Sequence, residues 1–152
     1  MRTITGLEEL RQAEGEDLGT SGWHEVTQRD VDAFADVTGD HQWIHVDPER
    51  ARTSPFGGTI VHGYYTLSLE PALSDQIFEL RGFAFVVNYG LNRVRFPAPL
   101  PVGSRVRLRA RVAAFEEVAG GAQITTELTF EREGGDKPVC VAEALARVYP
   151  AA

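Results

Sequence analysis

One segment decides the fold, residues 63–80, with the sequence Gly63-Tyr-Tyr-Thr-Leu-Ser-Leu-Glu-Pro-Ala-Leu-Ser-Asp-Gln-Ile-Phe-Glu-Leu80. Its apolar residues lie on most sides of a helix, which is typical of a helix buried all round rather than one that lies on a surface. Pro71 has no N–H to donate, so it is expected to kink or split this helix near its middle. A helix of this kind needs a surrounding layer, and the residues that follow it supply a sheet.

Beyond Gly82 the apolar residues repeat with a period of two, which predicts strands with one solvated face. Residues 105–112 alternate arginine with apolar side chains, and residues 123–131 alternate polar with apolar ones. Antiparallel hairpins are expected, in which arginine faces glutamate on the neighbouring strand. Hairpin turns are expected at Gly120-Gly121 and at Gly134-Gly135-Asp136. Two further strands are expected, one over 83–96 that is broken near Tyr89-Gly90 and one over 139–149.

Two capped helices are expected before the central helix. Thr27 and Asp30 have the spacing of a capping box, and apolar residues continue at helical spacing up to Gly39, a typical helix terminator. Asp47-Pro48 predicts a second, short helix that ends near Arg52. Residues 1–22 form an N-terminal segment with a short amphipathic start and a loop over 15–22.

The order of these elements predicts an α+β fold, an antiparallel sheet wrapped around a central apolar helix. With 152 residues and 43% hydrophobic content, the chain suits one domain over 1–152. Long alternating strands leave apolar area and an edge strand that one helix does not cover, so a homodimer is expected.

Composition excludes several classes of partner. The 15 basic and 22 acidic residues give a formal charge of −7, which opposes binding to nucleic acid or to anionic membranes. The single cysteine forms no internal disulfide, the first residues carry no apolar signal core, and no apolar run is long enough to span a bilayer. The sequence therefore predicts a cytoplasmic protein.

Polar residues with catalytic chemistry gather in residues 38–63. Asp40 and His45 lie five positions apart just beyond the first predicted helix, and His62-Gly63 begins the central helix. A carboxylate and an imidazole can activate one water, and a backbone N–H can stabilise an oxyanion. Taken singly, Asp40 also suits a turn, His45 a structural histidine and Gly63 a close-packing position.

Three stretches carry a resemblance: Thr-Gly-Asp-His-Gln-Trp-Ile-His-Val-Asp at 38–47, Gly-Thr-Ile-Val-His-Gly at 58–63 and Arg-Phe-Pro-Ala-Pro-Leu at 95–100. They resemble the MaoC-like dehydratase family, the (R)-specific enoyl-CoA hydratases, from about Asp30 to the C-terminus. The resemblance implies a hot-dog fold and a homodimer with the site near its interface. It also implies that Asp40 and His45 hold and activate the water. The chain departs from the family at Gln42, where asparagine is common, and at Trp43, where many members have proline.

Further roles follow from the same resemblance. The Gly63 N–H is expected to bind the thioester carbonyl as charge builds on its oxygen, with His62 bracing the loop and Gln42 retaining an amide. Ser68 stands where a related hydratase has a serine near the catalytic pair, although a helix serine bonded to its own backbone is an equal alternative. Arg93 and Arg95 are candidates to meet a partner chain or the phosphates of coenzyme A.

The resulting hypothesis is reversible hydration of a trans-2-enoyl-CoA, or of an acyl-carrier thioester, to the (R)-3-hydroxyacyl thioester. No cofactor and no metal are expected, because coenzyme A is part of the substrate and the spacing of His41, His45 and His62 matches no tight ligand cluster. Two alternatives are thioester hydrolysis on the same fold and a non-catalytic acyl-binding module.

Overall fold

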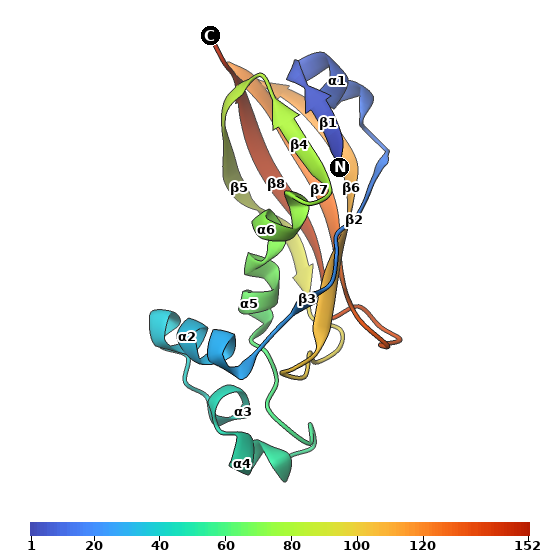
Figure 1. The fold of residues 1–152 in the computed structure, drawn as a ribbon. Helices are drawn as coiled ribbons and strands as arrows, with labels where there is room; N and C mark the ends of the chain where they lie inside the picture. Colours follow the sequence, from blue (N-terminus) through green and yellow to red (C-terminus); the bar gives the residue numbers. More distant parts are fainter.

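The computed structural model describes all 152 residues, and its main feature is a curved antiparallel sheet (Figure 1). Strands β5 (Phe83–Arg95), β6 (Arg105–Val118), β7 (Gly121–Arg132) and β8 (Cys140–Pro150) follow the predicted alternation. The sheet order is β2-β6-β7-β8-β5, where β2 is Asp17–Thr20, and the short strand β3 (His24–Glu25) also pairs with β6. The predicted strands and hairpins are confirmed, including an irregular register in β5 between Asn88 and Gly90.

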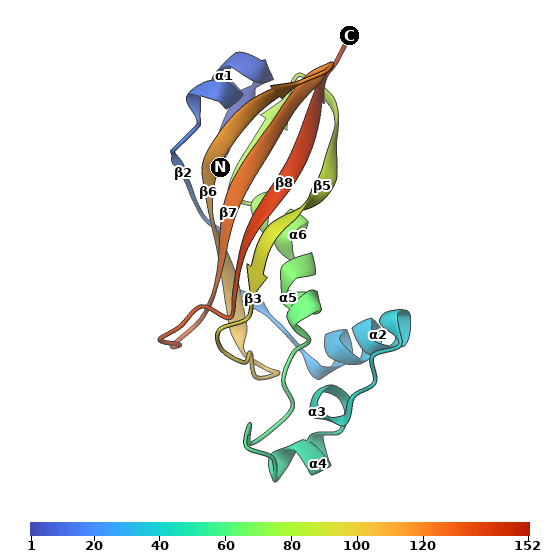
Figure 2. The same ribbon diagram turned by 180° about the vertical axis from the view of Figure 1, so that it is seen from behind.

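The two faces of the sheet differ as the alternation requires. Apolar residues of β6 and β7 are fully buried on the inner face, among them Leu108, Leu128 and Phe130. On the outer face, seen in Figure 2, the four alternating arginines each pair with an acidic side chain. The pairs are Arg105–Glu133, Arg107–Glu131, Arg109–Asp17 and Arg111–Glu127. The solvated arginine face is therefore confirmed.

The central helix is shorter and more exposed than predicted. It is split near Pro71, as expected, into α5 (Gly63–Ser68) and α6 (Glu70–Ser74). The prediction that the helix continues to Leu80 is wrong, because β4 (Phe78–Arg81) pairs in parallel with the N-terminal strand β1 (Arg2–Thr5). Burial all round is also wrong for a single chain, since the sheet covers one side only and Tyr64 is 73% exposed on the other.

The N-terminal segment contains more regular structure than predicted. It comprises β1, helix α1 (Gly6–Gln12) and strands β2 (Asp17–Thr20) and β3 (His24–Glu25). The prediction of a loop over 15–22 is wrong because β2 pairs with the edge of β6, and the Asp17 side chain forms an ion pair with Arg109. That pairing joins residues distant in sequence, and the local pattern does not reveal it.

Three helices project from one end of the sheet (Figure 1). Helix α2 (Gln28–Thr38) has the predicted capping box between Thr27 and Asp30, and it ends at Gly39, which takes the left-handed conformation that glycine adopts most easily (φ 81°). Helices α3 (Trp43–Val46) and α4 (Pro48–Arg52) follow, and Asp47 caps α4 as predicted. This end of the molecule meets the start of α5.

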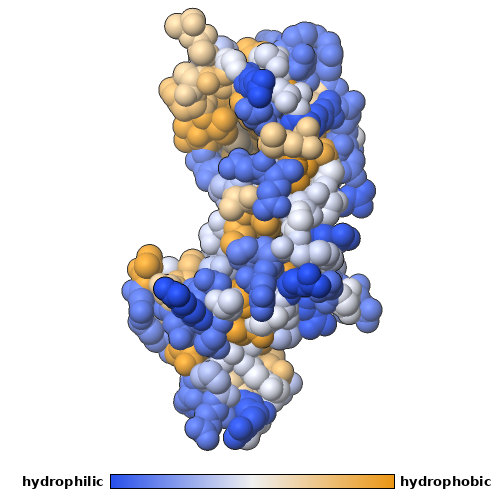
Figure 3. Space-filling model, in the orientation of Figure 1, coloured by the Kyte–Doolittle hydropathy of each residue, from blue (hydrophilic) through white to orange (hydrophobic).

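Strand β5 forms an uncovered edge of the sheet. Its 13 residues are almost all exposed, and five large apolar side chains among them face solvent. Hydrophobic surface gathers over this strand at the upper left of Figure 3. The five side chains are Phe85, Val86, Val87, Tyr89 and Leu91.

No helix of the fold is both long and apolar enough to cross a membrane.

Candidate active site

Asp40, His45 and His62 converge where the projecting helices meet α5. Asp40 follows the glycine that ends α2, His45 lies in α3, and His62 precedes the first residue of α5. One nitrogen or carboxylate oxygen from each lies within 4.8 Å of the others. The fold therefore brings together the predicted catalytic pair and the predicted supporting histidine.

His45 is held by a hydrogen bond at Nδ1, which leaves Nε2 of its ring available for chemistry. It is 7% exposed, and its Nδ1 donates to the Ile60 carbonyl at 2.6 Å. In the neutral ring this bond fixes the proton on Nδ1, so Nε2 is the basic atom. Burial lowers the pKa of His45, the neighbouring His62 lowers it further, and the Ile60 carbonyl and Asp40 oppose this shift. His45 is therefore suited to accept a proton.

His62 packs against both members of the pair. Its ring stacks on that of His45 with centroids 3.9 Å apart, and it is 2% exposed. Its Nε2 donates to the Asp40 carbonyl oxygen at 2.9 Å and lies 3.9 Å from the Asp40 carboxylate. These contacts suit the bracing role predicted for His62.

The Asp40 carboxylate faces the open side of the site. Its side chain is 52% exposed, and the backbone N–H of Gln42 donates to Oδ1 at 3.3 Å. The Gln42 side chain is exposed and forms no hydrogen bond. Gln42 thus contacts Asp40 through its backbone rather than through the amide that the resemblance suggested.

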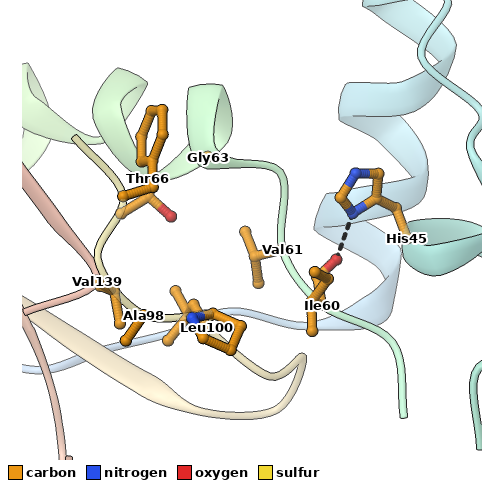
Figure 4. Close-up of a pocket in the computed structure, with 10 residues that line it drawn as sticks. His45, Ile60, Val61, Gly63, Thr66, Ala98, Leu100 and Val139 are labelled. Atoms are coloured by element: carbon orange, nitrogen blue, oxygen red, sulfur yellow. Dashed lines mark hydrogen bonds between the residues drawn. The ribbon is translucent and has the colours of Figure 1, made fainter. Parts of the chain in front are cut away.

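Gly63 lies at a small hollow beside His45. The hollow has a volume of about 260 Å³, and no group of the chain accepts the Gly63 N–H. Figure 4 shows His45 facing the segment of Ile60 and Val61, with apolar side chains on the other side of that segment. The lining residues are His45, Ile60, Val61, Gly63, Thr66, Phe96, Ala98, Pro99, Leu100 and Val139. A free backbone donor and a basic imidazole therefore line one hollow.

Three predicted residues lie away from both this hollow and the catalytic pair. The Ser68 hydroxyl donates to the Tyr65 carbonyl at 2.7 Å, which is the backbone-bonded alternative. Arg93 and Arg95 are exposed on β5, where Arg95 donates to the neighbouring Val94 carbonyl and Arg93 has no partner. Within one chain the structure does not bring these three side chains to the catalytic pair.

A larger hollow occupies another face of α5. It has a volume of about 1190 Å³ and lies between the central helices and the inner face of the sheet. Ser68 and Leu67 line it from α5, and small side chains such as Ala144 and Ala146 line it from β8. These alanines leave space that larger residues would fill.

Sequence reasoning missed several contributors to the site. The Ile60 carbonyl that orients His45 is a backbone group, so no residue type marks it. Phe96 lies over Gly63, where an added Cβ would come within 2.9 Å of its ring. Thr66 is a buried polar residue in an apolar run, and that contrast was the one signal available.

Asp40, His45 and His62 could also ligate a divalent cation, since each offers a suitable atom. Sequence spacing did not predict this cluster. His45 Nδ1 and His62 Nε2 are already engaged with backbone carbonyls, which leaves one nitrogen of each ring for another partner.

Comparisons with known proteins agree with this fold. A model of the MaoC-like domain matches residues 9–133. The 3-hydroxyacyl-thioester dehydratase Z of Mycobacterium tuberculosis is 52% identical over 148 residues, which cover 97% of this chain and 98% of that protein. Nodulation protein N of Rhizobium leguminosarum is 46% identical, covering 84% and 81% of the two chains. The solved (R)-hydratase from A. caviae superposes with a TM-score of 0.70 at 27% identity, covering 90% and 96%.

This chain belongs to the MaoC-like domain family and has the hot-dog fold that the resemblance implied.

Proposed function

We propose that this protein catalyses the reversible hydration of a trans-2-enoyl thioester to an (R)-3-hydroxyacyl thioester. The observation that carries the proposal is the His45–Asp40 pair, in which a buried imidazole has a ring nitrogen within 4.8 Å of an Asp40 carboxylate oxygen while its Nδ1 donates to the Ile60 carbonyl. The dehydratase and (R)-hydratase names of its relatives support the same chemistry.

Water lies between the two side chains in this mechanism. His45 Nε2 takes one proton from the water as its oxygen adds to C3, and the Asp40 carboxylate accepts a hydrogen bond from the O–H that stays on that oxygen. The proton is then returned to C2, so the pair ends in its starting state and the net change is addition of one water. A positioned acid or base of this kind contributes about 10² to 10⁴ in rate.

The Gly63 N–H is the proposed oxyanion donor. As water adds to C3, negative charge moves onto the thioester oxygen, and a donor already free of other partners can bind it. One such donor contributes about 10² to 10³ in rate. Gly63 and His45 line the same hollow, as this geometry requires.

We propose a cytoplasmic homodimer in which Arg93 or Arg95 meets the coenzyme A phosphates or the partner chain, and in which Ser68 and the larger hollow accommodate the acyl chain. We also propose that the reaction uses no metal or cofactor, because addition of water is redox-neutral and His45 and Asp40 carry the proton.

The absence of a metal requirement is tested directly. Exhaustive dialysis against a chelator is expected to leave hydration unchanged. Loss of activity that returns on adding a divalent cation would instead assign Asp40, His45 and His62 to a metal site.

One assay separates the proposed function from its competitors. Crotonyl-CoA and longer enoyl-CoA esters are incubated with the protein while enoyl absorbance and free thiol are followed in parallel. Hydration removes absorbance without releasing thiol, and hydrolysis releases thiol. A non-catalytic module changes neither signal and would end the enzymatic proposal.

A further inference from the structure

Gln28, the first residue of α2, makes an unusual set of contacts next to the candidate site. Its Oε1 accepts from the Thr59 hydroxyl at 2.6 Å, and its Nε2 donates to the His45 carbonyl at 2.7 Å. A third bond runs from Nε2 to Asp32 at 2.9 Å on the same helix. One amide therefore joins α2, α3 and the segment that leads to α5.

These bonds belong to a closed hydrogen-bond network around His45. The Ile60 N–H donates to the Ile44 carbonyl at 3.0 Å, and His45 Nδ1 donates to the Ile60 carbonyl. Gln28 and Thr59 complete the loop by tying the His45 backbone back to residue 59. Both the main chain and the ring of His45 are thereby fixed to one neighbouring segment.

Helix α3 needs such support. It has four residues, and no side chain caps its start at Gln42. A helix this short has no stability of its own in water, so its position depends on tertiary bonds. Displacement of a catalytic group by about 1 Å can cost about 10² in rate.

We propose that Gln28, acting with Thr59, is a positioning residue for His45. This inference rests on the proposed function, in which His45 is the base. This hydrogen-bond network needs, at position 28, a side chain of this length that has both an acceptor and a donor, and the amide of glutamine provides both. Gln28 itself has no role in the chemical step.

Four substitutions of Gln28 and Thr59 separate the hydrogen bonds from packing. Gln28→Met keeps the length and volume but removes all three bonds of the amide. Gln28→Glu keeps an acceptor for Thr59 but turns a carboxylate oxygen toward the His45 carbonyl and Asp32, where it is repelled. Thr59→Val removes the hydroxyl, while Thr59→Ser retains it and is expected to rescue.

Gln76 provides a matched control. Its Oε1 accepts from the Gly22 N–H at 3.1 Å and its Nε2 donates to the Ala72 carbonyl at 3.4 Å, so it also joins two segments, but it does not line the hollow beside His45. Gln76→Met is expected to lower the melting temperature without changing kcat.

Two readouts decide the proposal. In the Gln28 variants and Thr59→Val, kcat for crotonyl-CoA should fall at least about 10-fold with KM little changed. The acid limb of the pH profile of kcat should move to higher pH, because His45 gains contact with water and its pKa rises. By nuclear magnetic resonance, the His45 Nδ1 proton should lose its protection from exchange. This second readout does not depend on turnover, so it remains valid if the wild-type protein proves not to be a hydratase.

A protected Nδ1 proton in folded Gln28→Met would overturn the inference. So would a fall in kcat no larger than that of Gln76→Met at equal loss of stability. If Gln28→Met does not fold, the Thr59→Val and Thr59→Ser pair gives the same decision.

Discussion

The chemistry of the site depends on how two adjacent imidazoles are partnered. His45 and His62 are stacked and buried, and each donates one N–H to a backbone carbonyl. Burial opposes charging His45 and lowers its pKa, and repulsion from His62 acts in the same direction. The stack thus favours a neutral His45, the form in which its Nε2 can act as a base.

Removing either member of the proposed pair should abolish most activity. Asp40→Asn and His45→Gln are each expected to lower hydration at least about 10²-fold, because each group acts directly on the water. Crotonyl-CoA turnover is measured with circular dichroism on the same preparations. Asp36→Asn and His41→Gln are matched controls, since these exposed residues pair with each other nearby and should leave turnover unchanged. Normal turnover in a folded Asp40 or His45 variant would remove that residue from the mechanism.

Gly63→Ala tests the oxyanion donor. The backbone of Gly63 does not have a positive φ, so an added Cβ introduces no backbone strain, but it would meet the Phe96 ring at 2.9 Å. We expect turnover to fall more than melting temperature, because the Cβ blocks the thioester from the N–H. Phe96→Ala and the double variant separate the two causes. If Phe96→Ala restores the activity of Gly63→Ala, the loss came from packing and the oxyanion assignment is wrong.

The lowered pKa of His45 predicts how activity and stability vary with pH. Because the folded pKa lies below the ordinary value near 6.5, His45 stays neutral and active until the pH falls below that value. The unfolded chain takes up the proton first, so the stability from the neutral buried ring is present above the unfolded pKa and is lost as pH falls. His41 shifts the opposite way, since the Asp36 hydrogen bond raises its pKa.

Melting temperatures between pH 7 and pH 5 measure this effect. The fall on acidification should be smaller in His45→Gln than in the wild type, whereas His41→Gln should not reduce it. Equal falls in wild type and His45→Gln would show that His45 does not titrate below its ordinary range.

At the level of elements, helices marked by local sequence signals were predicted well, and strands that depend on pairing with distant segments were not. The capping box of α2 and its glycine terminator involve residues close in sequence, so composition and spacing sufficed. Strand β4 lies in a run whose apolar residues also suit a helix, and only its pairing with β1 makes it a strand. The same applies to β2, which is defined by its partner β6.

The site divides in the same way. Asp40, His45, His62 and Gly63 were predicted from residue type and spacing together with the family resemblance, and the fold brings them together. Gln28 acts through contacts with residues far along the chain, so no local pattern indicates it. Ile60 and Phe96 lie in the stretches 58–63 and 95–100 that carry the resemblance, but their contacts with His45 and Gly63 are not apparent from the order of residues.

The exposed edge of β5 predicts how the protein assembles. An uncovered strand with five exposed apolar side chains favours pairing with a second copy. Sedimentation should give about twice the monomer mass of 16.7 kDa. Val87→Asp combined with Leu91→Asp should shift the protein toward monomer, because both replace exposed apolar side chains of β5 with charge.

Val37→Asp is the control for this experiment. Val37 is 86% exposed on α2, so the same change there should leave the dimer intact. A wild-type monomer at micromolar concentration would contradict both the dimer and a site near its interface.

For the whole molecule, the central claim is that the fold directs water to C3 of an enoyl thioester. The most direct test is to incubate the protein with crotonyl-CoA in oxygen-18 water and to locate the label by mass spectrometry. We predict oxygen-18 in the 3-hydroxyl group of an intact hydroxyacyl-CoA, formed by the wild type and lost in Asp40→Asn. Label in a free carboxylate, with coenzyme A released, would contradict the account.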